Sequence, residues 1–148
     1  MDVSVIIVNY NTLRLTANCI DSIFRQTSGI TFEVILIDNA STDGSPEFFR
    51  SDKRITFIAS DTNLGFGRAN NLGYTHAKGD FIFLLNSDTI VENNALKIFH
   101  DAMSALPDKV ACIGCQLLNA TGGHSHSFGD YLTFRNSWQS VLQSLFSE

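Results

Sequence analysis

The stretch that most constrains the fold is residues 81–89, which read FIFLLNSDT. Five consecutive apolar residues end abruptly in an amide, a hydroxyl and a carboxylate. Such a run predicts a strand that is buried on both faces and whose C-terminal tip emerges at a polar site. Because open α/β sheets bind ligands at the carboxyl ends of their strands, Asp88 is the first residue to test for a function.

The remaining chain alternates between strand and helix patterns. Near-continuous apolar runs predict further strands at residues 3–10, 32–38 and 110–118, and a weaker one at 55–59. Helical spacing or capping residues between the strands predict helices at about residues 13–24, near Pro46, at 66–77 and at 96–106. This order predicts an α/β fold, with a mostly parallel sheet flanked by helices on both faces.

Charge bounds the class of partner. The chain has 148 residues, with Lys+Arg 10 against Asp+Glu 15, and its net charge is −5. A broad nucleic-acid interface needs a basic face, so we expect no nucleic-acid partner. A small anionic ligand is compatible with this charge, because backbone amides and a metal ion can hold it locally.

Cysteine usage and the start of the chain bear on location. The three cysteines are an odd number, which argues against a disulfide framework and favours a reducing cytosol. No basic region precedes the first apolar run, and 18 consecutive apolar residues occur nowhere. We therefore expect neither a signal peptide nor a membrane-spanning helix. We expect a cytoplasmic protein, with the inner face of the membrane as a possible place of action.

Polar residues follow three of the predicted strands. Asn9 and Tyr10 end the first, Asp38 and Asn39 follow the second, and residues 86–88 follow the strand at 81–85. The carboxyl ends of parallel strands meet at one edge, so these groups should converge on one ligand. Each of them alone is also compatible with a turn or a helix cap, but their convergence favours a binding site.

A carboxylate at this edge suits a hard divalent cation. Mg²⁺ or Mn²⁺ binds one or two carboxylates together with diphosphate oxygens and water. Asp88 is placed for that role, in which the metal would neutralise charge on a departing diphosphate. Asp38 is better suited to a hydrogen bond with a base or ribose.

Four motifs carry a family resemblance. They are SVIIVNYN, VILIDNASTDGS, NLGFGRANNLG and FIFLLNSDT, in this order. Over residues 3 to about 118 the chain resembles the family 2 glycosyltransferases of GT-A fold, particularly the rhamnosyltransferase-like branch of bacterial cell-surface polysaccharide synthesis. The resemblance implies metal-assisted, inverting transfer of a sugar from a UDP- or dTDP-sugar to a carbohydrate or lipid-linked acceptor.

The resemblance also implies a donor site, with Asp88 as the ligand of Mn²⁺ or Mg²⁺. The other residues expected in it are Val8, Asn9, Tyr10, Asp38, Asn63, Gly65, Asn71, Asn86 and Ser87. The first three would line the base pocket, Asp38 would bind base or ribose, and the residues from 63 to 71 would form the third wall. The NSD sequence stands where the family has a DXD motif, with Asn86 in place of its first carboxylate.

The C-terminal part departs from the family pattern. We expect residues 119–148 to form a hairpin-like segment and an amphipathic helix, the start of an incomplete acceptor-side region, so the fold should be truncated. The family's catalytic base is not identified here, and Asp130 is more typical of a turn. The apolar stripe of the last helix would be buried in a homodimer or, less favoured because Arg135 is its only cation, on a membrane surface.

Two other functions remain open from the sequence. Without a catalytic base, the chain could be a nucleotide-binding module or fragment that catalyses nothing. A flavodoxin-like or receiver-type signalling domain also carries acidic residues at strand ends. The receiver type, however, needs an acidic pair after the first strand, where this chain has Asn9 and Asn11.

Overall fold

The computed structural model describes residues 1–115, 117–119 and 121–125, so the predicted C-terminal helix and Asp130 lie outside the described residues. The chain divides into two compact units, residues 1–107 and 108–148. The predicted division at residue 118 concerns donor and acceptor functions, and it stays a prediction. Among the described residues, no helix is both long and apolar enough to cross a membrane.

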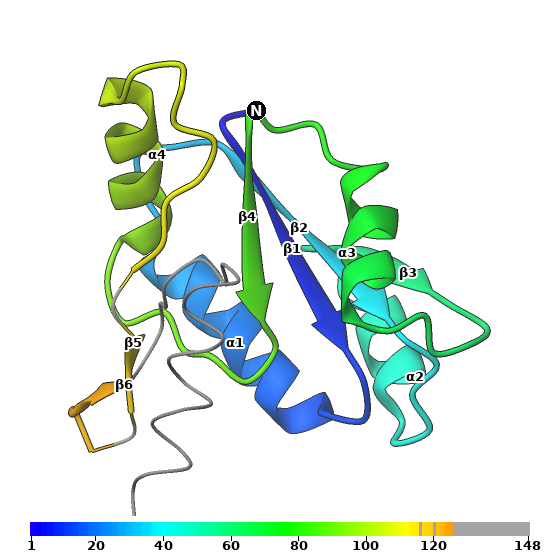
Figure 1. Ribbon diagram of the computed structural model, residues 1–148. Coiled ribbons are helices and arrows are strands. Elements are labelled where there is room, and N and C mark those ends of the chain that lie inside the picture. Colours follow the sequence, from blue (N-terminus) through cyan, green and yellow to red (C-terminus); the bar gives the residue numbers. More distant parts are fainter. Residues whose placement is uncertain (116, 120, 126–148) are drawn as a thin grey trace, which may run out of the picture. The chain divides into compact units, whose positions relative to one another are not determined.

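The first unit alternates strands and helices as the sequence predicts. Its elements are β1 (Val3–Asn9), α1 (Leu13–Gln26), β2 (Phe32–Asp38), α2 (Ser45–Arg50), β3 (Thr56–Ala59), α3 (Phe66–Tyr74), β4 (Phe81–Asn86) and α4 (Ala95–Ala105). The four strands form a parallel sheet in the order β3-β2-β1-β4 (Figure 1). The expected parallel α/β sheet is therefore confirmed.

Helices cover both faces of this sheet, because the apolar strands have two sides to bury. On one face, alternate residues of β1 and β2 pack with residues of α1, α2 and α4, including Ile20, Phe49 and Leu96. On the other face, α3 packs through Ala69. A Cβ on Gly73 would lie 2.5 Å from a methyl carbon of Ile6, so the glycine permits this close approach of α3 to β1.

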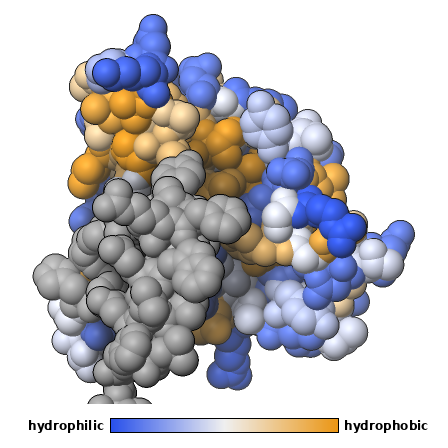
Figure 2. Space-filling view, in the orientation of Figure 1, coloured by the Kyte–Doolittle hydropathy of each residue, from blue (hydrophilic) through white to orange (hydrophobic). Residues whose placement is uncertain are grey.

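The expectation that β4 is buried on both faces is wrong for the described residues. Phe83 and Leu85 pack against the core shared with α1, but Leu84, on the opposite face, is 56% exposed. Figure 2 shows hydrophobic residues along β4 on the visible face. The reason is topological: β4 is an edge strand here, and α3 lies over β1 and β2 rather than over β4.

The expected strand at residues 110–118 is also wrong. Of the described residues in this range, only Leu117–Leu118 (β5) form a strand, which pairs antiparallel with His124–Ser125 (β6) in a separate two-stranded sheet. A strand forms where a partner supplies ladder hydrogen bonds, and among the described residues the pairing joins Leu117 with Ser125 and Leu118 with His124. Apolar composition alone could not reveal that limit. The hairpin itself agrees with the expected turn-rich character of this segment.

Candidate functional site

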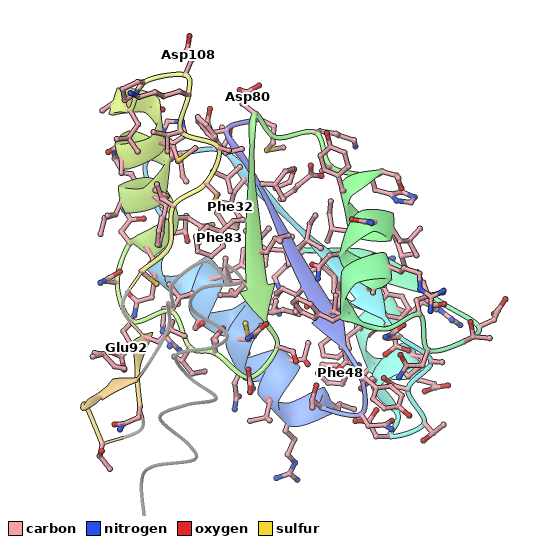
Figure 3. All side chains as sticks on the ribbon, in the orientation of Figure 1. Phe32, Phe48, Asp80, Phe83, Glu92 and Asp108 are labelled. Carbon is pink, nitrogen blue, oxygen red and sulfur yellow. The ribbon has the colours of Figure 1, made fainter. Side chains whose placement is uncertain are left out.

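The strand tips predicted to converge do meet at one edge of the sheet. Asn9 lies in register with Asp38 on β2, and Val8 lies in register with Asn86 on β4. In Figure 1 the arrowheads of β1 and β4 point to the same end of the sheet. Asp80, which precedes β4, lies at the opposite end (Figure 3). Parallel topology thus gathers polar residues that are far apart in sequence.

A buried amide and a buried carboxylate form the centre of the site. Asn9 and Asp38 are 0% and 1% exposed, respectively. Asn9 Nδ2 donates to Asp38 Oδ1 at 2.7 Å and to Ser41 Oγ at 3.0 Å, and the Ser41 backbone N–H donates to Asp38 Oδ2 at 2.9 Å. Burial of a carboxylate is costly unless hydrogen bonds compensate, and here each oxygen accepts one.

The amide oxygen of Asn9 links the strand tips to α1 and to the turn after β4. Thr12 Oγ1 and Thr16 Oγ1 each donate to Asn9 Oδ1 at 2.8 Å. Thr12 Oγ1 also lies 3.3 Å from Ser87 Oγ. Asn9, Asp38 and Ser87, all expected in one site, are therefore joined by a continuous series of polar contacts.

A second asparagine holds the loop between β3 and α3. Asn39 is 3% exposed; its Nδ2 donates to Asn63 Oδ1 at 2.8 Å, and its Oδ1 accepts from the Leu64 N–H at 2.8 Å. Gly65 N donates to Asn63 Oδ1 at 2.9 Å. These bonds tie two expected third-wall residues to the tip of β2. Asn71 is exposed on α3, and its side chain makes no hydrogen bond among the described residues.

The loops that follow β1 and β2 take sharp turns at the site. Asn11 and Ala40 have positive φ angles of 55° and 66°. Asparagine tolerates this left-handed conformation, whereas alanine adopts it at a cost of about 1–2 kcal/mol. The surrounding bonds compensate: Ser41 on one side of Ala40 and Asn39 on the other are both held by polar contacts.

Asp43 anchors the same region through two helix starts. Its Oδ2 accepts from the Leu13 N–H of α1 at 2.9 Å, and its Oδ1 accepts from the Ser45 N–H of α2 at 3.1 Å and from the Ser45 hydroxyl. Partial desolvation opposes ionisation of the exposed Asp43 carboxyl, but hydrogen bonds from Ser45 and Leu13 outweigh it and lower its pKa. The charge also suits two helix N-termini.

The turn after β4 presents Asp88 to solvent. Its side chain is exposed and makes no hydrogen bond or ion pair among the described residues. The turn itself is held from below: Thr89 Oγ1 donates to the Asn86 carbonyl at 2.7 Å, and the buried Cys19 thiol donates to the same carbonyl at 3.6 Å. Burial raises the pKa of Cys19 to about 11, so this thiol stays neutral and acts as a packing group.

This arrangement fits a divalent metal held mainly by its substrate. No group of three or more His, Cys, Asp or Glu residues among the described residues could form a protein-only cage. Mg²⁺ and Mn²⁺ do not need one, because diphosphate oxygens and water complete their shell. The Asp88 carboxylate makes no hydrogen bond or ion pair among the described residues, so it is free to serve as the predicted protein ligand. The exposed Asn86 lies at the start of the same turn.

Several residues that organise the site are not among those predicted from the sequence. Ser41, Thr12 and Thr16 contact Asn9, yet each has a residue type that is common in turns and first helical turns. Their spacing after strand tips was the one available signal. Of the expected base-pocket residues, Tyr10 is 50% exposed and can offer its ring to a ligand, and Val8 is half-buried.

The fold and the site together define a class of protein. It is an α/β protein with a parallel sheet, of the kind that binds ligands at the carboxyl ends of its strands, and it carries Asp38 and Asp88 at two of these ends. The model of the glycosyl transferase family 2 matches residues 4–142. The chain therefore belongs to glycosyl transferase family 2, which excludes a receiver-type signalling domain.

Two curated relatives agree with this assignment. Glycosyltransferase GlyG of Streptococcus pneumoniae is 33% identical over 102 residues, covering 66% of this chain and 34% of the relative. Succinoglycan biosynthesis protein ExoO of Rhizobium meliloti is 29% identical over 131 residues, covering 87% of this chain and 37% of the relative. The chain thus spans about a third of the length of either relative.

Solved structures show the GT-A fold. TarS 1–349 of S. aureus in complex with UDP-GlcNAc matches with a TM-score of 0.59 and 28% identity, over 70% of this chain and 30% of TarS. Mannosyltransferase PcManGT of Pyrobaculum calidifontis, in complex with GDP-Man and Mn²⁺, matches with a TM-score of 0.61 and 27% identity, over 72% of this chain and 32% of that protein.

Proposed function

We propose that the chain is the donor-binding part of a glycosyltransferase that transfers a sugar from a UDP- or dTDP-sugar. The observation that carries the proposal is the hydrogen-bonded convergence of Asn9, Asp38 and Ser87 at one sheet edge in a family 2 chain. Open α/β sheets bind nucleotides at this edge. The complex of TarS with UDP-GlcNAc supports a nucleotide-sugar donor for a chain of similar fold.

In the proposed site, different side chains would bind different parts of the nucleotide-sugar donor. The Asp38 carboxylate, fixed by Asn9 and Ser41, would accept a hydrogen bond from the base or ribose. Tyr10 would cover the base, and Asn63 and Gly65 would close the third wall. A side chain fixed in advance loses little entropy when it binds, which favours affinity.

Asp88 would hold Mn²⁺ or Mg²⁺ against the diphosphate. When bound, the metal would neutralise charge on the leaving diphosphate and so lower the barrier to its departure. Asn86 and Ser87 would orient the turn and contact the ribose. The complex of PcManGT with GDP-Man and Mn²⁺ supports this role for a metal in a chain of similar fold.

The acceptor side of the reaction rests on the family and on the name of one relative. We propose an inverting displacement, with a carbohydrate or lipid-linked acceptor, in cell-surface polysaccharide synthesis at the cytoplasmic side of the membrane. The name of ExoO, a succinoglycan biosynthesis protein, supports this class of product. A homodimer or membrane contact through residues 138–146 would bury the apolar stripe there.

The proposal is tested by calorimetric titration of the folded chain with UDP and dTDP, with and without Mn²⁺. We expect binding that Mn²⁺ strengthens by about tenfold, and that Asp88→Ala reduces to the metal-free level. Asp61→Ala, which removes an exposed carboxylate from the loop after β3, is the matched control and should bind as the parent does. Absence of any nucleotide binding in a folded sample would contradict the proposal.

A second candidate function is nucleotide binding without catalysis. It is favoured by one observation, that no residue in the described part of the chain is identified as a catalytic base. Detection of sugar transfer, or of donor hydrolysis that Asp88→Ala abolishes, would exclude it. Binding of UDP with no turnover of any UDP- or dTDP-sugar would support it.

A further inference from the structure

The Asn9 side chain stands between the two halves of the proposed donor site. β1 lies between β2, which carries Asp38, and β4, which leads into the Asp88 turn. Asn9 is fully buried and uses every polar position of its amide within the protein. Its nitrogen contacts Asp38 and Ser41, and its oxygen contacts Thr12 and Thr16. It therefore acts on a ligand through its neighbours.

The direction of these hydrogen bonds follows from the chemistry of the groups. An amide oxygen only accepts hydrogen bonds. Thr12 and Thr16 therefore each donate their single hydroxyl proton to Asn9 Oδ1. In the 3.3 Å contact between Thr12 and Ser87, Ser87 is then the donor. The result is a chain of bonds in one direction, from Ser87 through Thr12 and Asn9 to Asp38. Hydrogen bonds aligned in this way polarise and strengthen one another.

We propose that Asn9 is a positioning residue that couples the nucleoside half of the donor site to the metal half. The ligands named in this proposal are those of the proposed function, on which it therefore rests. A base or ribose held at Asp38 orders the chain that orients Ser87, and with it the adjacent Asp88. Because coupling free energies are reciprocal, metal and diphosphate bound at Asp88 strengthen nucleoside binding at Asp38 by the same factor.

A purely structural role for Asn9 makes a different prediction. A buried asparagine that only satisfies strand-end groups would affect stability, and its loss would lower affinity only in proportion to the folded fraction. The factor by which Mn²⁺ strengthens UDP binding would then stay constant. That factor is therefore the quantity to measure, with the folded fraction of each variant determined by thermal unfolding.

The first experiment cuts the chain of bonds at one point. Thr12→Val removes the hydroxyl between Asn9 and Ser87 but leaves the bonds from Asn9 to Asp38 and Ser41. Thr75→Val is the matched control, because its hydroxyl donates to the Leu72 carbonyl of α3, remote from the site. Calorimetric titration with uridine measures the affinity of the nucleoside half of the proposed site. Titration with UDP, with and without Mn²⁺, measures the factor by which the metal strengthens binding, and uridine with Mn²⁺ is the control without a diphosphate.

For Thr12→Val we expect uridine affinity within about twofold of the parent, and a Mn²⁺ enhancement of UDP binding that is reduced about fivefold. Asn9→Leu should weaken uridine and UDP binding together and abolish the enhancement. Thr75→Val should match the parent. An unchanged enhancement in Thr12→Val would overturn the proposal, whether or not Asn9→Leu folds.

A second measurement does not depend on nucleotide binding. Backbone amide resonances of the ligand-free chain report the two ends of the chain of bonds, at Ser41 and at Ser87. Asn9→Leu should shift both, and Thr12→Val should shift Ser87 while leaving Ser41 in place. If the parent binds no nucleotide, the proposed function fails, but these shifts still test the chain of hydrogen bonds on which the coupling rests. A Ser87 resonance unmoved by Thr12→Val would contradict it.

Discussion

The tips of β1 and β2 and the tip of β4 are built in opposite ways. At the first, Asn9 and Asp38 are buried, and hydrogen bonds within the protein engage each polar atom of the Asn9 amide and both oxygens of Asp38. At the second, Asp88 is exposed and makes no hydrogen bond or ion pair among the described residues. The first tip is pre-organised by the protein, whereas the second has room for partners that arrive with a substrate.

Because the two tips differ in this way, substitutions at them should affect stability and ligand binding differently. A buried, bonded carboxylate contributes to folding, so its removal should cost both stability and binding. An exposed, unengaged carboxylate contributes little to folding, so its removal should cost binding alone. Predictions at Asp38, Asp43 and Asp88 test the comparison in order of decreasing effect on stability.

The largest effect is expected for Asp38→Ala. The substitution leaves the Ser41 N–H and one N–H of Asn9 without an acceptor in a buried site, which should lower the free energy of unfolding by about 3 kcal/mol. Urea denaturation measures the loss. Asp61→Ala, on an exposed loop, should change stability by less than about 0.5 kcal/mol. Equal stabilities of the two variants would show that the β2 tip is not pre-organised.

An intermediate effect is expected at Asp43, and it depends on pH. Hydrogen bonds hold the pKa of this carboxyl below its ordinary value of 3.8, so its contribution to stability is present above that value and lost as pH falls through the lower folded-state pKa. Because Asp43 is exposed to solvent, we expect the contribution to stay below about 1 kcal/mol.

Asp43→Asn removes the titration while keeping the size of the side chain. The variant should be less stable than the parent at neutral pH, and the difference should shrink as pH falls below about 4. Urea denaturation of both proteins across this range measures it, with other titrating groups common to both. A difference that grows on acidification would mean that the pKa of Asp43 is raised on folding.

The smallest effect on stability is expected for Asp88→Ala. With no bond to lose among the described residues, the variant should unfold within about 0.5 kcal/mol of the parent. The same preparation should lack metal-dependent UDP binding. A loss of stability as large as that of Asp38→Ala would mean that the β4 turn depends on its carboxylate, and the contrast between the two tips would fail.

Much of the fold was predictable because the strands are strongly apolar. The runs at residues 3–10, 32–38 and 81–85 became β1, β2 and β4 within one or two residues. The run at 110–118 did not, because pairing needs a partner edge that composition cannot reveal. The exposure of Leu84 was also unpredictable, since the same apolar run is compatible with a central or an edge strand.

For the candidate site, topology did what residue type could not. Asn9, Asp38 and Ser87 could be expected at one edge because parallel strands end together. The bridging positions of Ser41 and Thr12 could not, since serine and threonine are common wherever a chain turns or a helix begins. Their roles depend on distances of about three ångströms between segments about 30 and 75 residues apart.

The sequence by itself determined the alternation of strands and helices, the family and the polar strand ends, because periodicity and local motifs are properties of the chain. The strand ends at Asn9 and Asp38 and the strand end at Asn86 and Asp88 have similar residue types. Only the tertiary structure shows that the first are buried and the second is exposed. Burial depends on neighbours. β1 lies between two strands, and its Asn9 accepts hydrogen bonds from Thr12 and Thr16 at the start of α1, while the turn after β4 lies at the edge of the described sheet. In this position Asn9 joins Asp38 to Thr12 through hydrogen bonds, whereas Asp88 is exposed and can contact a ligand.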